Sequence, residues 1–223
     1  MHQRISKKII FYIFLFFLFG TVNNLNIYKF KIPNVDNIVI DGFNENEKLK
    51  ILAQLNFLKI QNIFFLKKFK IQEILSLDNS IDKFYIFKRY PSTLEIQITK
   101  TEVLANILID GSNYLVGQNG KLIKSNSIKK DKPFIFGEAK IDEFIKLRNK
   151  LKKADFDYTH IKNFYFFNSE RWDLEMKNGI LIKLPQKEID KTIKIILEFL
   201  SKNNKNNISI IDARINNQII ING

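Results

Sequence analysis

The distribution of apolar and polar residues divides the chain into three parts. Residues 9–22 form a mainly apolar run without charge. Residues 37–102 then show strand-like alternation and helix-like spacing in the order strand, helix, helix, strand, strand. Beyond residue 103, short alternating segments are separated by turn signals such as Asn119-Gly120. The pattern predicts an α+β protein.

The N-terminal run predicts a transmembrane helix. Its 14 residues would span only about 21 Å as a helix, but continuation to Tyr28 gives about 30 Å, the thickness of a bilayer core. We therefore predict a cytoplasmic tail over residues 1–8, a membrane span over residues 9–28 and a linker over residues 29–36. Basic residues before the run place the N-terminus inside. A cleaved secretory signal and a buried soluble helix are the alternatives, although no A-x-A pair follows the run.

The middle part predicts a compact β-α-α-β-β unit over residues 37–102. Asn44 and Glu47 have capping-box spacing at the start of its first helix. We expect Leu49, Leu52, Ala53 and Leu55 to form the apolar face of that helix. The expected elements are a strand over 37–41, helices from residue 44 and over 70–77, and strands over 81–89 and 93–101 joined at Tyr90-Pro91. This element order is that of a POTRA module.

The third part, residues 103–223, predicts a mostly antiparallel β-sheet domain with two helices. Apolar residues recur at helical spacing over residues 140–153 and 188–202. Strands are expected around both helices, and the chain closes with predicted strands over 208–213 and 218–221.

Composition narrows the function without assigning one. The net charge is +13, which suits nucleic acid, an anionic membrane surface or an acidic polymer, but the lysines are scattered and no basic run is interleaved with stacking aromatics. We therefore expect no nucleic-acid partner. The chain has no cysteine, which excludes thiolate metal sites and thiol catalysis. His160 and Trp172 have no catalytic constellation around them, so we expect structural roles, no cofactor and no metal.

Four motifs in order resemble the bacterial cell-division family FtsQ/DivIB. They are RYPSTLEIQI from Arg89, YLVGQNGKLI from Tyr114, WDLEMKNGILIKLP from Trp172 and IDARINNQIII from Ile211. The resemblance covers nearly the whole chain after residue 9. Two positions depart from the family pattern, which usually has an acid at Lys100 and a proline at Val103. Both lie where the two predicted domains join, so they leave the angle between the domains open.

The resemblance implies a non-enzymatic, single-pass inner-membrane protein with its C-terminal bulk in the periplasm, concentrated at the division septum. It implies binding of the small coiled-coil division proteins FtsB and FtsL, and recruitment or regulation of the septal synthases FtsW and FtsI. The family's principal partner contact follows a D-x-R motif, here Asp212-Ala213-Arg214, so Ile215–Ile221 is the matching strand.

The physical chemistry of the C-terminal residues is consistent with that assignment. A short terminal strand often lies at a sheet edge, where unpaired backbone groups can accept another strand. Without the resemblance, the favoured interpretation is that Ile219–Ile221 fill the domain's own core. The predicted partner-binding residues are Arg214, Ile215, Gln218, Ile219, Ile220 and Ile221, and a predicted secondary face comprises Lys88, Arg89 and Tyr90.

Two other functions stay open. The first is a POTRA-containing envelope factor that binds or chaperones secreted or outer-membrane polypeptides by the same strand addition. The second is a small envelope enzyme or glycan-binding protein that uses its basic charge, although no acid-base pair has recognisable spacing.

Overall fold

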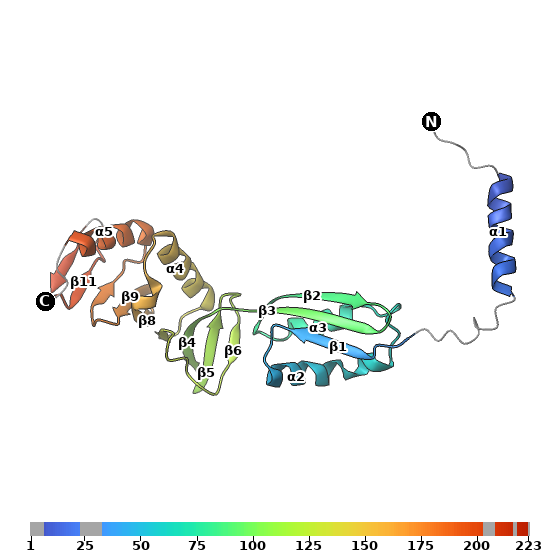
Figure 1. Ribbon diagram of the computed structural model, residues 1–223. Coiled ribbons are helices and arrows are strands. Elements are labelled where there is room, and N and C mark those ends of the chain that lie inside the picture. The colour runs from blue at the N-terminus through green and yellow to red at the C-terminus, as the bar shows by residue number, and fades with distance from the viewer. Residues whose placement is uncertain (1–6, 23–32, 203–207, 216–217, 223) are drawn as a thin grey trace.

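The structure is a computed structural model that describes residues 7–22, 33–202, 208–215 and 218–222 (Figure 1). Its α-helices are α1 (Lys7–Val22), α2 (Glu45–Leu55), α3 (Phe69–Ser76), α4 (Ile141–Lys153) and α5 (Ile189–Lys202). Its strands are β1 (Asn37–Asp41), β2 (Ile81–Arg89), β3 (Thr93–Lys100), β4 (Val103–Ile109), β5 (Ser112–Gly117), β6 (Leu122–Lys124), β7 (Phe134–Phe136), β8 (Ile161–Phe167), β9 (Arg171–Met176), β10 (Leu181–Lys183), β11 (Ile210–Asp212) and β12 (Ile220–Asn222). The predicted α+β class is confirmed.

Helix α1 contains most of the predicted membrane span. It has 16 residues, and its large side chains are exposed along its length. Within the described part of the chain, no helix is both long and apolar enough to cross a bilayer. The predicted continuation over residues 23–28, and the first half of the predicted linker, lie outside the described residues.

The first folded unit is a three-stranded sheet in the order β1-β3-β2, with β1 parallel and β2 antiparallel to β3. Side chains of α2, α3 and the sheet share one hydrophobic core. The capping box is present, since Asn44 Oδ1 accepts from Glu47 N at 2.9 Å and Glu47 Oε2 accepts from Asn44 N at 3.0 Å. Each strand of this unit begins at its predicted residue.

The predicted apolar face of α2 is right only in part: Leu55 is buried and Leu52 packs on the core, as predicted. Ile51 and Leu55 are the buried residues of this helix, whereas Leu49 and Ala53 are exposed. Apolar residues occupy most of the positions from 49 to 55, so their spacing fits more than one helix face. The core therefore selects the face that adjoins Leu58 and Ile71, which sequence spacing alone could not identify.

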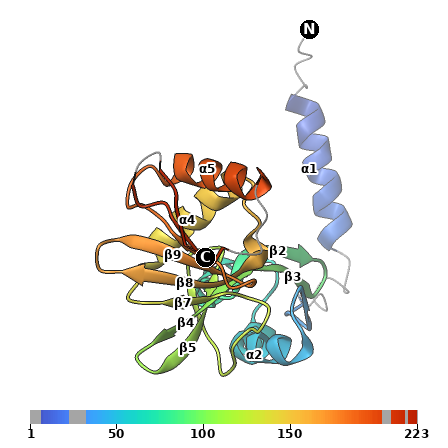
Figure 2. The same ribbon diagram turned by 90° about the vertical axis from the view of Figure 1, so that its left-hand side faces the viewer.

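The second unit is a nine-stranded mixed sheet in the order β12-β11-β10-β9-β8-β7-β4-β5-β6. Three of its eight neighbouring pairs are parallel, namely β4 with β7, β7 with β8, and β10 with β11. The other five pairs are antiparallel, in agreement with the predicted mostly antiparallel sheet, but strand β7, which makes two of the parallel pairs, had not been predicted. Helices α4 and α5 lie together over one face of the sheet (Figure 2).

The central core row runs across the sheet beneath these helices. Register aligns one residue from each of seven neighbouring strands: Ile107, Ile135, Phe164, Leu174, Ile182, Ile211 and Ile221. The first six are buried and pack with Phe144, Leu147 and Leu151 of α4 and with Ile193 and Ile196 of α5. Ile221, at the end of the row, is 44% exposed. The hydrophobic core thus continues to the last strand without enclosing it.

The two units meet through side-chain amides. Asn119 Nδ2 donates to the carbonyl oxygens of Asn79 and Ile81, both at 3.1 Å, and Asn79 Nδ2 donates to Leu122 O at 2.8 Å. These bonds connect the β5–β6 turn with the segment between α3 and β2. Because the bonds run in both directions, the contact restrains the two units against one another.

A matched pair of glycines tests the packing of the first unit. Gly42 has φ +96°, and a Cβ there would lie 1.8 Å from Ile98 O, whereas Gly111 has φ +71° with open space around it. We expect Gly111→Ala to lower the free energy of unfolding by about 1 kcal/mol through backbone strain alone. Gly42→Ala should cost at least about 3 kcal/mol, because backbone atoms must also move apart. Urea unfolding measures both changes, and equal losses would contradict this packing.

Candidate partner-binding edge

Strand β12 forms one edge of the nine-stranded sheet. Among the described residues its only strand partner is β11, and register places Ile220 opposite Asp212 and Ile221 opposite Ile211. The strand begins at Ile220 rather than at the predicted Gln218. The edge strand therefore consists of the three residues Ile220–Asn222.

The hydrogen-bond pattern of β11 fixes which backbone groups of β12 face outward. Ala213 N donates to Lys183 O, and Ser209 O accepts from Leu181 N, which in a parallel ladder flank an Ile211 bonded to β10, whereas Ser209 N donates to Asn222 O of β12. Strand alternation then turns the Ile211 backbone to β10 and the Asp212 backbone to β12. Ile220 consequently exchanges its bonds with Asp212. Ile221, opposite Ile211, directs its N–H and C=O away from the sheet.

The other edge, β6, is partly covered. Gly117 N donates to Lys121 O and Ser125 N donates to Asn113 O, so alternation turns the backbone of Leu122 outward. That outward carbonyl accepts the hydrogen bond from Asn79 of the first unit. The first unit thus shields β6 as natural sheets shield their edges, and leaves β12 as the more accessible edge.

The predicted partner-binding residues differ in their surroundings. Ile219 is half-buried and packs on the core, whereas Gln218 and Ile215 are exposed. Ile221 continues the helix-covered core row, and Ile220, which is 54% exposed, points to the opposite, open face. An incoming strand would therefore meet an apolar side chain on each face of the sheet.

Arg214 is held in an ion pair at the same edge. Its Nε donates to Asp212 Oδ1 at 2.8 Å and to Oδ2 at 2.9 Å. The Arg214 hydrogen bond lowers the pKa of the Asp212 carboxyl, and Asp212 raises the pKa of Arg214. Lys183 lies between Asp212 and Asp173 in the strand register, and burial raises the pKa of Asp173. A charged row thus leads across the open face to Ile220.

A second polar group lies further along the open face. Glu175 Oε1 accepts from Lys162 Nζ at 2.7 Å, and its Oε2 accepts from Tyr165 Oη at 2.6 Å and from Asn163 Nδ2 at 2.8 Å. These three donors, led by Lys162, lower the pKa of Glu175 to about 2. No spacing in the sequence indicates this group, since its members come from two strands.

The predicted secondary face is distant from β12. Lys88 Nζ donates to Phe64 O at 3.1 Å, Arg89 pairs with Glu95 at 2.6 Å, and the Tyr90 ring stacks on Phe64 with centroids 4.6 Å apart. The β2–β3 turn that contains them and the C-terminal strand lie at opposite ends of the folded part of the chain (Figure 1). The structure therefore does not bring the two predicted faces together.

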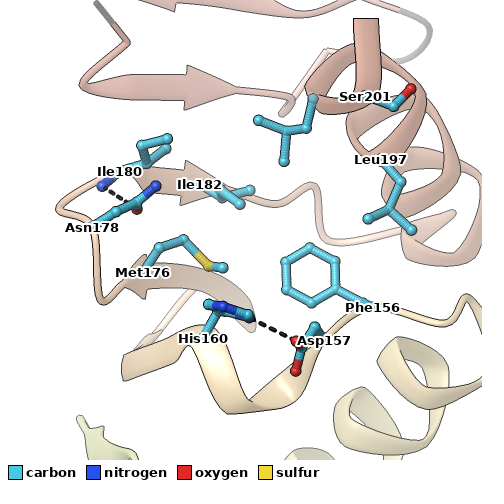
Figure 3. Close-up of a pocket in the computed structure, with 10 residues that line it drawn as sticks. Phe156, Asp157, His160, Met176, Asn178, Ile180, Ile182, Leu197 and Ser201 are labelled. Atoms are coloured by element: carbon cyan, nitrogen blue, oxygen red, sulfur yellow. Dashed lines mark hydrogen bonds and ion pairs between the residues drawn. The ribbon is translucent and has the colours of Figure 1, made fainter. Parts of the chain in front are cut away.

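A cavity of about 340 Å³ lies beneath α5 (Figure 3). Phe156, Met176 and Leu197 point into it, and Ile182 connects it to the core row. Its polar groups are engaged locally: His160 Nδ1 pairs with Asp157 at 2.7 Å, and Ser201 Oγ donates to Glu198 O at 2.7 Å. Its lining residues do not form a nucleophile–base pair, so this cavity offers no catalytic arrangement.

Comparison with known proteins gives concordant matches. Residues 105–214 match the family model described as cell division protein FtsQ/DivIB, C-terminal. The chain is 31% identical over 195 residues to cell division protein FtsQ of Rickettsia typhi, covering 84% of this chain and 71% of that protein. It is also 31% identical over 176 residues to FtsQ of Rickettsia bellii, covering 77% of this chain and 64%, less than two thirds, of that protein.

A solved structure also matches weakly. It is the major extracytoplasmic domain of the trans isomer of the cell-division protein DivIB from Geobacillus stearothermophilus. The TM-score is 0.35 with 14% identity, over 48% of this chain and 99% of that domain. A likeness of this size adds nothing to the assignment.

The sequence matches define a bacterial cell-division protein. The chain belongs to the FtsQ/DivIB family. The predicted resemblance is thereby confirmed.

The Glu175 group predicts an acid-dependent loss of stability. An unfolded glutamate titrates near pH 4.5, and this one titrates at about 2 in the fold, so its contribution is complete above pH 4.5 and disappears as the pH falls toward 2. Glu175→Gln should lower the free energy of unfolding by about 1–2 kcal/mol at pH 6 and by almost nothing at pH 2. Urea titrations across this range measure the difference. The exposed Asp82→Asn serves as control, and a pH-independent Glu175→Gln effect would refute the assignment.

Proposed function

We propose that this chain is a non-enzymatic scaffold of septum assembly that captures an FtsB- or FtsL-type partner by strand addition at β12. The main support is the position of Ile221, whose backbone N–H and C=O point outward from a strand that pairs with β11 on its other side. Backbone hydrogen bonds would supply affinity, and side chains on alternate faces would supply selectivity.

The surroundings of β12 support an ordered partner strand. A side chain placed beside Ile221 would extend the core row beneath α5, and a side chain beside Ile220 would lie near the Asp212–Arg214 pair. Arg214 could then contribute a charge to the partner at the rim. Such a site selects a strand with one apolar and one polar face.

We further propose the domain arrangement and location that this role requires. Residues 37–102 would be a POTRA domain and residues 103–223 the C-terminal partner-binding domain, after a cytoplasmic tail over 1–8, a single inner-membrane pass over 9–28 and a linker over 29–36. The exposed apolar side chains of α1 support an anchor, because no protein core covers them in the structure. The bulk of the chain would then lie in the periplasm at the division septum.

The secondary face, Lys88, Arg89 and Tyr90, would make a separate contact. Its distance from β12 in Figure 1 means that a second division protein could bind there while β12 is occupied. As part of the same scaffold function, this chain would recruit or regulate FtsW- and FtsI-type septal synthases. Depletion separates this function from the chaperone alternative, since loss of a septal scaffold causes filamentation and loss of a chaperone causes outer-membrane protein defects.

Proline substitution tests strand addition at one backbone group, the N–H of Ile221. Ile221→Pro removes the outward N–H but no bond to β11, a position where edge strands tolerate proline. We expect capture of a purified FtsB-type partner to weaken at least about tenfold, since the added strand loses a hydrogen bond and the edge loses its regular shape. Affinity measurements with the immobilised full chain provide the readout.

Ile221→Val is the matched control, because it keeps the donor and the β-branched shape, and it should bind nearly as the parent does. Circular dichroism and the unfolding midpoint show that both variants keep the fold. Unchanged partner affinity in a folded Ile221→Pro variant would exclude strand addition at this residue.

A further inference from the structure

The first unit carries an exposed apolar face that its own core does not explain. Ile60, Phe65 and Phe69 are 81%, 76% and 71% exposed, and Phe64 is also exposed. Ile63 and Leu66, which lie between them, and Ile71, which follows them, are almost fully buried. The fold therefore needs the buried set, while the exposed set is available for another surface.

Lysines outnumber acids around these aromatic residues, and the next acid in the sequence is the exposed Glu73, one turn after Phe69 on α3. Residues 48–72 contain six lysines and no aspartate or glutamate. Lys59, Lys67 and Lys70 are exposed beside Ile60, Phe65 and Phe69, and Phe65, Lys67, Phe69 and Lys70 share one shallow hollow. We call the set Lys59, Ile60, Phe64, Phe65, Lys67, Phe69 and Lys70 the lysine–aromatic face.

Tertiary contacts hold this face in place. Lys68 Nζ donates to Ile86 O, Lys88 Nζ donates to Phe64 O, and the Tyr90 ring stacks on Phe64. These contacts fix the segment before α3 against the β2–β3 hairpin. The exposed rings are consequently presented from a rigid support.

The face lies where the chain arrives from α1. Val35 N donates to Gln61 O at 3.0 Å, Ile63 N donates to Pro33 O at 3.4 Å, and Asn34 bridges to Asn62. Eleven peptide steps separate Val22 from Pro33, so this point lies at most about 40 Å from the end of α1 along the chain. In Figure 1 the β2–β3 turn is at the end of the folded part from which the chain leads back to α1.

We propose that the lysine–aromatic face docks on the surface of an anionic phospholipid bilayer. Phenylalanine side chains on a basic amphipathic surface enter the boundary between headgroups and acyl chains, and each lysine near an anionic surface contributes about 1 kcal/mol, or about fivefold in binding. Charge complementarity favours lipid, because the lysines of this face would meet phosphates while its rings enter the interface. The proposal is independent of partner capture at β12.

Docking would orient the whole chain. With the lysine–aromatic face on the bilayer, the second unit and β12 would point away from it, since they occupy the other end of the folded part (Figure 1). The amide contacts of Asn79 and Asn119 would transmit that orientation to the second unit.

The absence of cysteine from the chain allows a clean depth measurement. Ile60→Cys and Leu77→Cys introduce label sites at apolar residues that are 81% and 79% exposed, the second lying outside the face at the end of α3. Each full-length variant carries a fluorophore and is reconstituted into phosphatidylethanolamine–phosphatidylglycerol vesicles that contain doxyl-labelled lipid. We expect lipid quenching of the label at position 60 and none at position 77.

Charge substitution completes the test. Lys67→Gln with Lys70→Gln should lower the docking equilibrium about 30-fold, whereas Lys152→Gln with Lys153→Gln on α4 should leave it unchanged. Phosphatidylcholine vesicles should reduce quenching as the first pair does. Three results would overturn the proposal: equal quenching at both label sites, no quenching at either site, or quenching that survives the Lys67–Lys70 change. Loss of quenching when a protein partner binds this face would also overturn it.

Discussion

The core row beneath α4 and α5 is the constraint on which the second unit depends. Six strands contribute buried residues to this row. At each end of the sheet, the last strand has a neighbouring strand on one side only. At β6 the first unit supplies a side-chain amide to the outward carbonyl. At β12 the row ends on the half-exposed Ile221, whose backbone faces outward, so the fold itself creates the proposed binding edge.

The two ends of the folded part have different chemistry. One end, where the chain from α1 enters the folded part, presents lysines and aromatic rings, which suit a lipid surface. The far end presents isoleucines beside an arginine–aspartate pair, which suits an added strand. The amide contact between the units joins these ends mechanically, so anchoring one positions the other. This arrangement agrees with a scaffold whose function is placement rather than chemistry.

Sequence patterns predicted most of the fold, and the departures have physical causes. Period-two alternation located β2 and β3, and the Asn44–Glu47 spacing located α2. Strand β7 escaped prediction because three residues after a proline show no periodicity, and its parallel pairing depends on distant strands. The apolar face of α2 was ambiguous because that helix is apolar at most of its later positions. At the candidate site the sequence indicated an edge, but only the bonds of Ala213 and Ser209 identified Ile221 as its outward residue.

Hydrogen exchange at two adjacent amides tests the central claim most directly. In the free chain, the Ile220 amide should exchange slowly because it bonds to β11, and the Ile221 amide should exchange rapidly because it faces solvent. A bound FtsB-type strand should slow exchange at Ile221 strongly and change Ile220 little. Protection of Ile221 in the free chain, or an Ile221 rate that the bound partner leaves unchanged, would contradict the account.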